Sequence, residues 1–190
     1  RIVIRPQWTE VEAKPGDVVI ALDPGMAFGT GTHPTTQLCL ESVEALTQQG
    51  IRVLDLGTGS GILAIAAAKL GAVDVLALDN DPVAIEAAVD NIAQNGVADK
   101  ITAQTGSLES VLASARRFDL IVVNILVKII IPMCEQGLGQ TVRPGGKAIF
   151  SGIIDAQADD VEAALRATGL VPFNRRTQGD WVAIEAHRPQ

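Results

Sequence analysis

The residues with the clearest chemical potential form the run Asp55-Leu56-Gly57-Thr58-Gly59-Ser60-Gly61. Glycines at this density allow a tight turn and let a ligand approach the backbone, because glycine has no side chain and adopts positive φ readily. The run follows a predicted strand and precedes a predicted helix beginning Ile62-Leu63, which is where doubly wound folds hold a cofactor. A glycine-rich turn without a ligand is the alternative. We expect a cofactor to dock against Gly57, Gly59 and Gly61.

A carboxylate lies at the end of the next predicted strand. Asp79 comes twenty-two positions after Gly57, at the end of the second predicted strand. Doubly wound folds place an acidic residue there against ribose hydroxyls, so the pair indicates an adenosine-containing cofactor. By itself, Asp79 could instead be a loop or cap residue. The dinucleotide fingerprint would need its third glycine at position 62, which is Ile62, so a nicotinamide oxidoreductase is a distant alternative.

The elements that must position these residues follow a regular order from residue 51 onward. Short runs rich in β-branched residues alternate with Ala/Leu-rich segments of helical period, a pattern typical of a parallel sheet with crossover helices. Strands are predicted at residues 52–55, 73–79, 101–105, 120–124 and 147–151, helices from about Gly61, Pro82, Leu108 and Leu126, and a further helix at 155–167. Residues 170–175 and 181–187, separated by residues 177–180, read as a hairpin. The sequence therefore predicts an α/β doubly wound sheet whose last strands are antiparallel.

The first fifty residues contain a different pattern. We expect a strand at 18–22 and a helix at 33–48, joined by a Gly/Thr/Pro-rich loop at 23–32 that could close over a bound ligand or simply connect the two elements. Residues 1–50 are assigned to the same domain as the core at 51–190. Because the chain opens on the apolar residues Ile2, Val3 and Ile4 without an initiating Met, it is expected to be part of a longer protein.

Composition excludes several classes of protein. A chain of 190 residues with 47% hydrophobic residues is long enough for one domain with a core. The net charge of -7 argues against a general nucleic-acid binder and favours a basic protein partner, although acidic surfaces are often merely solvated. The two cysteines are far apart and predict neither a disulfide nor a zinc site, so a reducing cytoplasm fits. Residues 120–133 are too short and too polar to cross a membrane.

The run from Asp23 to Thr36, Asp-Pro-Gly-Met-Ala-Phe-Gly-Thr-Gly-Thr-His-Pro-Thr-Thr, resembles the signature of the ribosomal protein L11 methyltransferase family. Further matches at residues 57–65, 79–82, 124–126 and 144–146 extend the resemblance over nearly the whole chain. The glycine loop preceded by Asp55 is similar to the cofactor loop of class I methyltransferases, which have a Rossmann-like sheet of about seven strands.

The resemblance implies a protein N-methyltransferase that uses S-adenosylmethionine, releases S-adenosylhomocysteine and needs no metal. Its acceptors would be lysine side chains and an α-amino group of a large-subunit ribosomal protein. The family's separate N-terminal recognition domain is expected to be missing from this chain. The implied cofactor-binding residues are Phe28, Gly29, Thr30, Gly31, Thr32, Thr36, Asp55, Gly57, Gly59, Gly61, Asp79, Asn80 and Asn124.

Asn124 is also the candidate catalytic residue. It ends the fourth predicted strand, and its side chain offers both an acceptor and a donor with which to hold an incoming amine. A strand-end cap is the alternative. Methyltransferases that act on amides or nucleobases usually have Asn/Asp-Pro-Pro-aromatic here, whereas this chain has Asn124-Ile125-Leu126 and no Tyr, so a platform for a flipped base is hard to build. Methylation of another protein or a small molecule, or cofactor binding without turnover, remain the alternatives.

Four other residues could take part in chemistry but have simpler interpretations. His33 could act as a general base, although a hydrogen-bonded loop residue is favoured. Cys39 and Cys134 fall on helical patterns and are expected to be packed. Trp181 is expected to pack the final hairpin, and its position also lets it approach the edge of the sheet that carries the site.

Overall fold

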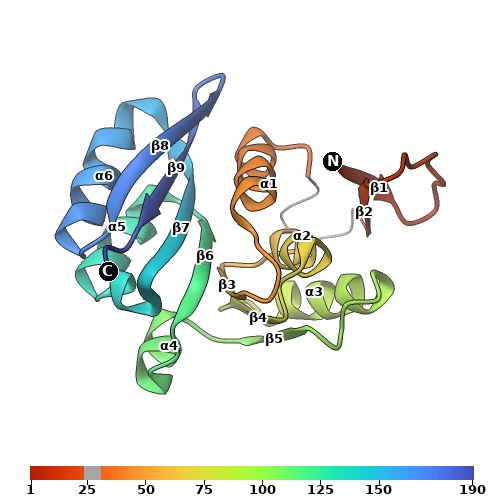
Figure 1. Ribbon diagram of the computed structural model, residues 1–190, viewed down its shortest axis with the longest axis horizontal. Coiled ribbons are helices and arrows are strands. Elements are labelled where there is room, and N and C mark those ends of the chain that lie inside the picture. Colours follow the sequence, from red (N-terminus) through yellow and green to blue (C-terminus); the bar gives the residue numbers. More distant parts are fainter. Residues whose placement is uncertain (24–30) are drawn as a thin grey trace.

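The structure is a computed structural model that describes residues 1–23 and 31–190. Its centre is a seven-stranded sheet of order β5-β4-β3-β6-β7-β9-β8 (Figure 1). The strands are β3 (Arg52–Leu56), β4 (Asp74–Asp79), β5 (Ile101–Thr105), β6 (Phe118–Asn124), β7 (Val142–Ile154), β8 (Val171–Gln178) and β9 (Trp181–His187). Strands β3 to β7 are parallel, and β9 is antiparallel to both β7 and β8. The predicted α/β sheet with an antiparallel hairpin at its end is confirmed.

The strand order reverses between β3 and β6. From β3 the chain steps outward through β4 to β5, then returns to place β6 on the other side of β3. Such a switch point opens a crevice beyond the carboxyl ends of the two central strands, because their connections leave in opposite directions. The glycine loop follows β3 and Asn124 ends β6, so this topology brings the two predicted parts of the site together.

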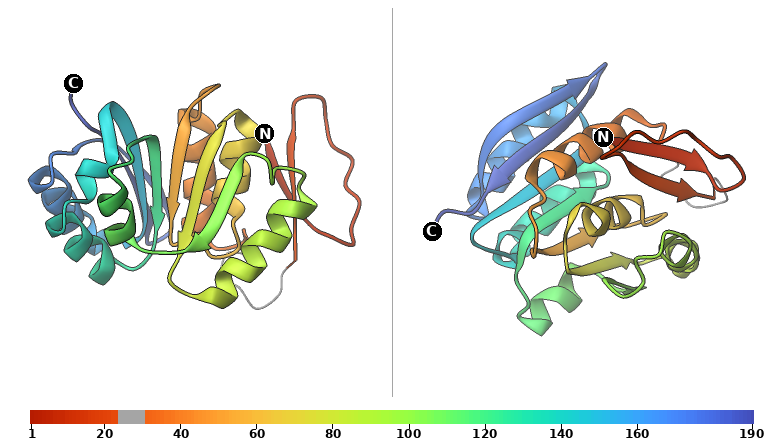
Figure 2. Two further views of the ribbon diagram at one scale, coloured as in Figure 1. Left: turned by 90° about the horizontal axis from the view of Figure 1, so that it is seen from below. Right: turned by 45° about the vertical axis from the view of Figure 1, so that its right-hand side comes forward.

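Helices cover both faces of the sheet (Figure 2). They are α1 (Pro34–Leu46), α2 (Ile62–Leu70), α3 (Pro82–Gln94), α4 (Leu108–Ser114), α5 (Val127–Glu135) and α6 (Ala158–Ala167). Successive strand residues point to opposite faces, so Val122 packs with α1, α2 and α3, while Val123 packs with α4, α5 and α6. Both faces of the central strands are therefore buried, as their continuous apolar sequences predict.

The segment before α1 forms a structure of its own. Strands β1 (Ile2–Pro6) and β2 (Val18–Leu22) pair in parallel as a two-stranded sheet, separate from the main one (Figure 1). The side chain of Asn95, at the end of α3, bonds both the N–H and the carbonyl of Ala21. The predicted strand at 18–22 is confirmed, and its hydrogen bonds to α3 attach this small sheet to the core.

Several predicted boundaries were wrong where tertiary contacts decide them. Strand β7 begins at Val142, not at residue 147, because Val142 pairs with Phe118 across a register shift. Helix α6 begins at Ala158, not at residue 155, because residues 155–157 form a 3₁₀ turn ahead of it, in which the N–H of Asp155 bonds the carbonyl of Asp180 in the neighbouring hairpin. Strand β8 extends to Gln178, which shortens the hairpin turn to residues 179–180. Among the described residues, no helix is long and apolar enough to span a membrane.

Candidate active site at the carboxyl edge of the sheet

A cavity of about 490 Å³ lies at the carboxyl edge of the sheet. Its walls come from the loops after β3, β4, β5 and β6, the last part of β7, the starts of α1, α2 and β9, and α5. This volume falls within the range of about 300–1,000 Å³ that is typical of small-ligand sites. The lining residues are His33, Thr35, Thr36, Leu56, Gly57, Thr58, Gly59, Ile62, Leu63, Asp79, Asn80, Gly106, Ser107, Asn124, Ile125, Leu126, Ile129, Met133, Gly152 and Trp181.

The three predicted loop glycines serve different purposes. All have positive φ, and the N–H groups of Gly57 and Thr58 both donate to the carbonyl of Leu78 in β4. Gly57 and Gly59 line the cavity. Gly61 does not line it, and a Cβ at that position would lie 3.3 Å from Cβ of Ala88 in α3. The third glycine is therefore needed for the close packing of α2 against α3.

Asp79 lies where the sequence predicts it, at the polar end of the cavity. One carboxylate oxygen accepts the N–H of Gly59 at 3.0 Å, and the other accepts the N–H of Asp81 at 3.0 Å. A carboxylate has about four lone-pair sites, so both oxygens can still accept hydroxyl groups from a ligand. Asn80 and the Gly106–Ser107 pair after β5 complete this polar end.

Asp55 lies beneath the glycine loop and does not line the cavity. Its side chain is 1% exposed, and its Oδ2 accepts hydrogen bonds from the hydroxyl of Thr58 at 2.6 Å and from the N–H of Ala64 at 3.1 Å. Within the described residues its other oxygen has no partner. Burial raises the pKa of Asp55 to about 6, while the hydrogen bonds from Thr58 and Ala64 oppose the rise. Asp55 supports the loop from below.

This raised pKa predicts a pH-dependent cost in stability. The folded state holds a proton up to about pH 6, whereas the ordinary pKa of 3.8 means that the unfolded chain has already released it. The contribution of Asp55 to the free energy of unfolding is therefore largest below pH 4 and falls as pH rises towards 6. We expect Asp55→Asn to remove this slope in denaturant unfolding measured at several pH values. A constant difference between variant and wild type from pH 4 to 7 would contradict the assignment.

The other end of the cavity is apolar. Asn124 is half-buried at the end of β6, opposite Ser151 of β7, and lines the cavity where the two ends meet. Beyond it the wall consists of Ile125, Leu126, Ile129 and Met133. Leu126 and Ile129 are 55% and 40% exposed, so this wall opens to the surface. The arrangement suits a ligand that is polar at one end and meets an apolar approach path at the other.

His33 is the N-cap of α1. Its Nδ1 accepts the N–H of Thr35 at 3.3 Å and lies 2.8 Å from the hydroxyl of the same residue. The ring stacks edge-on against Trp181, with centroids 4.9 Å apart. The hydrogen-bonded interpretation of His33 is confirmed, and Trp181 does reach the site edge. Thr36, predicted to bind the cofactor, is 1% exposed and lines the cavity from the first turn of α1.

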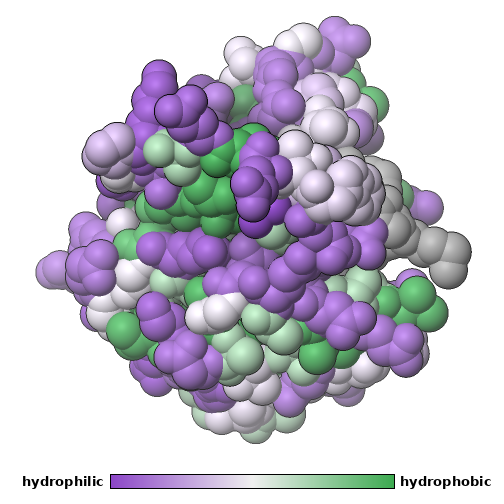
Figure 3. Space-filling view, turned by 90° about the vertical axis from the view of Figure 1, so that its right-hand side faces the viewer, coloured by the Kyte–Doolittle hydropathy of each residue, from purple (hydrophilic) through white to green (hydrophobic). Residues whose placement is uncertain are grey.

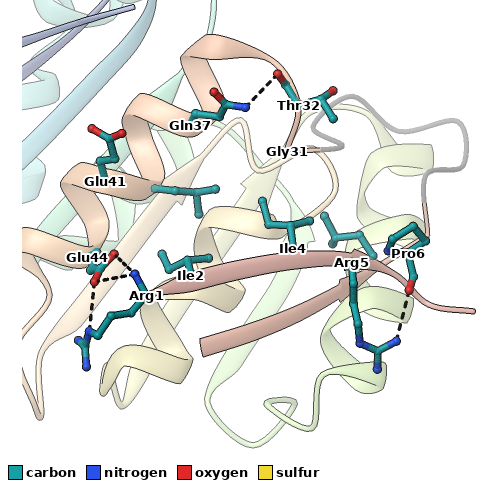
Figure 4. A pocket seen from close by; sticks show the side chains of 12 residues that line it. Arg1, Ile2, Ile4, Arg5, Pro6, Gly31, Thr32, Gln37, Glu41 and Glu44 are labelled. Atoms are coloured by element: carbon teal, nitrogen blue, oxygen red, sulfur yellow. Dashed lines mark hydrogen bonds and ion pairs between the residues drawn. The ribbon is translucent and has the colours of Figure 1, made fainter. Parts of the chain in front are cut away.

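Two other predicted cofactor residues lie elsewhere. Gly31 and Thr32 line a separate cavity of about 750 Å³ between β1 and α1 (Figure 4). Gly31 lies at the partition between the two cavities, since a Cβ there would be 2.5 Å from Cδ1 of Ile4 and 3.2 Å from Cδ1 of Ile62. The face that carries β1 is mostly polar with separate apolar patches (Figure 3). The remaining predictions, Phe28, Gly29 and Thr30, lie outside the described residues.

The sequence interpretation missed several lining residues. Gly106 and Ser107 follow β5, and Gly152 lies near the end of β7. They share the signal that identified Gly57, Asp79 and Asn124, which is a small or polar residue at the carboxyl end of a parallel strand. Cys39 and Cys134 are buried, as expected. No group of three or more metal-ligating side chains occurs among residues 1–23 and 31–190.

Comparison with known proteins identifies close relatives over the whole chain. Residues 1–189 match the family model described as ribosomal protein L11 methyltransferase (PrmA). A ribosomal protein L11 methyltransferase from Chloroflexus aurantiacus is 47% identical over 212 residues, which cover 100% of this chain and 64% of the relative. One from Shouchella clausii is 46% identical over 189 residues, covering 100% of this chain and 59% of the relative. The chain thus spans about three-fifths of the length of these curated relatives.

Solved structures agree with this match. A ribosomal protein L11 methylase from Lactobacillus delbrueckii subsp. bulgaricus superposes with a TM-score of 0.87 at 38% identity, covering 100% of this chain and 95% of that one. An O-methyltransferase family protein from Burkholderia thailandensis has a TM-score of 0.67 at 16% identity, covering 82% of this chain and 56% of that one. The second similarity shows that the fold is shared with methyltransferases of other kinds.

Proposed function

The chain belongs to the ribosomal protein L11 methyltransferase family, and we propose that it transfers methyl groups from S-adenosylmethionine to amino groups of ribosomal protein L11. The observation that carries the proposal is one cavity with the glycine loop and Asp79 at its polar end and Asn124 beside its apolar wall. The first set suits an adenosine cofactor and the second suits an incoming amine. The family match supports this choice of cofactor and acceptor.

The residues present fit this cofactor. Asp79 is free to accept ribose hydroxyls while its hydrogen bond to Gly59 keeps the loop in place. Asn80, Gly106 and Ser107 would surround the adenosine end, and Gly57, Gly59 and Thr36 would lie along the remainder. Asp55 and Gly61 act from beneath the loop. When bound, S-adenosylmethionine supplies an electrophilic methyl group on a cationic sulfur.

The loop that precedes α1 completes the proposed cofactor site. Phe28, Gly29, Thr30, Gly31 and Thr32 remain proposed as the segment that covers the methionine end. The position of Gly31 supports the proposal, because a Cβ there would lie 3.2 Å from Cδ1 of Ile62, a residue of the cavity wall.

Asn124 would hold the acceptor amine. Free lysine has a pKa near 10.4 and is cationic at neutral pH, yet only a neutral amine has the lone pair needed for attack. The apolar wall of Ile125, Leu126 and Ile129 disfavours the ammonium form by desolvation, and the Asn124 carbonyl accepts an N–H of the neutral amine. A bound cofactor would supply the methyl group, the neutral amine held by Asn124 would accept it through its lone pair, and the methylated nitrogen would then release a proton to solvent.

Two exposed aspartates next to the cavity wall suit a basic partner. The N–H of Asp155 bonds the carbonyl of Asp180 at 2.9 Å, which brings two exposed carboxylate residues side by side. They adjoin Ile154 and Trp181, which are paired in register between β7 and β9. Trp181 lines the cavity, and exposed carboxylates beside it attract a basic protein and raise its association rate. We propose that they favour the basic ribosomal protein.

Charge reversal at these two aspartates tests the basic partner. We expect Asp155→Lys with Asp180→Lys to lower kcat/KM for the ribosomal protein about tenfold at low salt, because attraction becomes repulsion. The affinity for S-adenosylhomocysteine should stay unchanged, since neither residue lines the cavity. Raising the ionic strength should reduce the difference in kcat/KM between variant and wild type. An effect independent of salt would show that these carboxylates do not guide the acceptor.

The proposed reaction is tested by mass spectrometry of ribosomal protein L11 after incubation with enzyme and cofactor. We expect added methyl groups with the wild type and a loss of about 10- to 100-fold in rate with Asn124→Ala, at a nearly unchanged melting temperature. Asn95→Ala is the matched control. It removes an asparagine that bonds Ala21, so it should lower the melting temperature and spare transfer. Methylation of other substrates but never of this protein would establish a different acceptor.

Residues 1–50 and 51–190 are proposed to act as one cofactor-binding unit. Pro34–Leu46, within the first segment, contributes Thr35 and Thr36 to the cavity wall, which supports this grouping. The relatives are longer than this chain, and we propose that a separate recognition domain in the family contributes to holding the ribosomal protein. Such a domain would present each target amine at a high effective concentration.

A further inference from the structure

Ile125 lies between the loop after β3 and the last part of β7. It follows β6, and β6 lies between β3 and β7 in the sheet. The residue after β6 is therefore flanked by Gly57, just after β3, and by Gly152, near the end of β7. All three line the cavity. Both glycines have positive φ, +81° and +82°.

Both glycines make close contact with Ile125, but with different parts of it. A Cβ at Gly57 would lie 2.5 Å from Cγ2 of the Ile125 side chain. A Cβ at Gly152 would lie 2.2 Å from the carbonyl oxygen of Ile125 and 2.8 Å from its carbonyl carbon. At these distances, any residue with a Cβ at position 57 or 152 would force the glycine backbone or Ile125 to move. The side chain of Ile125 thus packs against Gly57, and its backbone packs against Gly152.

Strand β7 is shaped for this contact. Its pairing with β9 shifts register between Phe150 and Ile153, so Gly152 lies in the irregular stretch. An irregularity of this kind re-aims the backbone of a strand, and here it brings residue 152 against the loop after β6. The chain continues from Ile125 through Leu126, the N-cap of α5. The residue held between the two glycines therefore lies directly between Asn124 and the start of α5.

We propose that Ile125 is a positioning residue for methyl transfer, clamped between Gly57 and Gly152 so that Asn124 keeps its place relative to the glycine loop. The proposal rests on the proposed function and deepens it. It also explains why position 57 is a glycine without invoking ligand contact, because Ile125 occupies the space that a Cβ at this position would need. Moving Ile125 changes the distance between the amine-holding and cofactor-holding sides of one cavity.

Substitution of Ile125 separates positioning from folding. Ile125→Ala should lower kcat about 10- to 100-fold, because small errors of alignment cost that much in group transfer. Cofactor affinity and melting temperature should change little, since Ile125 is only partly buried. Ile125→Val keeps a methyl at Cγ2 and should recover most of the rate. Wild-type kcat in Ile125→Ala would overturn the proposal.

Double variants test the two contacts independently of the acceptor. Gly57→Ala should weaken binding of S-adenosylhomocysteine, and adding Ile125→Ala should restore part of it, because the Cγ2 that meets the new Cβ is gone. Ile125→Ala should not rescue Gly152→Ala, whose clash is with backbone that alanine retains. Gly96→Ala is the control for backbone strain alone, as Gly96 has φ +67° and nothing within 4 Å of its Cβ position.

The possible results separate this proposal from the proposed function. Simple additivity of Gly57→Ala and Ile125→Ala in calorimetry would overturn the clamp, even if the wild type methylates ribosomal protein L11. A wild type that binds the cofactor but methylates no ribosomal protein would overturn the proposed function. The clamp is then decided by calorimetry with S-adenosylhomocysteine, which needs no acceptor.

Discussion

Asp79→Ala is expected to weaken binding of S-adenosylhomocysteine by about 1–3 kcal/mol, or roughly 5- to 150-fold in affinity. Two losses combine in this variant. The ribose hydroxyls would lose a charged acceptor, and the N–H groups of Gly59 and Asp81 would lose the carboxylate that orders the loop. Isothermal titration calorimetry measures the change directly. Unchanged affinity would remove Asp79 from the cofactor site.

Asp81→Ala is the matched control for Asp79. It removes a carboxylate two positions away that caps α3 by accepting the N–H of Val83 at 2.9 Å. Loss of such a cap costs about 1 kcal/mol of stability. Because Asp81 does not line the cavity, cofactor affinity should be nearly unchanged. A fall in affinity as large as that of Asp79→Ala would mean that general loss of negative charge explains both results.

Glu185→Ala is expected to lower the free energy of unfolding by roughly 2–4 kcal/mol. The Glu185 residue is 2% exposed in β9, and its carboxylate accepts hydrogen bonds from Ser42 in α1 and from Asn174 and Arg176 in β8. Its removal leaves all three donors without this acceptor and removes one link between the terminal hairpin and α1. Urea unfolding of wild type and variant measures the difference.

The contribution of Glu185 to the free energy of unfolding should decrease as pH falls. Burial alone would raise its pKa, but the hydrogen bonds from Arg176, Ser42 and Asn174 outweigh burial and lower the pKa below the ordinary value of 4.5. Its stabilisation is therefore present at neutral pH and is lost as pH falls through the lowered pKa. The gap between Glu185→Ala and wild type should shrink under acid conditions.

Asp159→Ala provides the exposed counterpart. The side chain of Asp159 in α6 is 89% exposed and forms an ion pair with Arg175 of β8, in the same hairpin as Glu185. Pairs exposed to solvent contribute at most about 1 kcal/mol, so this variant should be close to wild type in stability. An equal loss from Asp159→Ala and Glu185→Ala would show that the burial of Glu185 has no special importance for the hairpin.

Local sequence patterns were sufficient to predict the fold. Strands at 101–105 and 181–187 have the predicted bounds, and α3 begins at Pro82 after its Asp81 cap. These elements are decided by hydrophobic period, capping residues and turn residues, all of which are interactions between near neighbours in the chain. The same patterns identified Gly57, Asp79 and Asn124, because each marks the end of a predicted parallel strand.

The tertiary structure alone decided what each of these residues touches. Gly57 and Gly61 look equivalent in the sequence, yet one contacts Ile125 and the other Ala88. Asp55, predicted as a cofactor residue, instead supports the loop, and Gly31 lies at the partition between the two cavities. Which strands are neighbours determines these contacts between residues distant in sequence, and the hydrophobic period of a strand is the same whichever strand lies beside it.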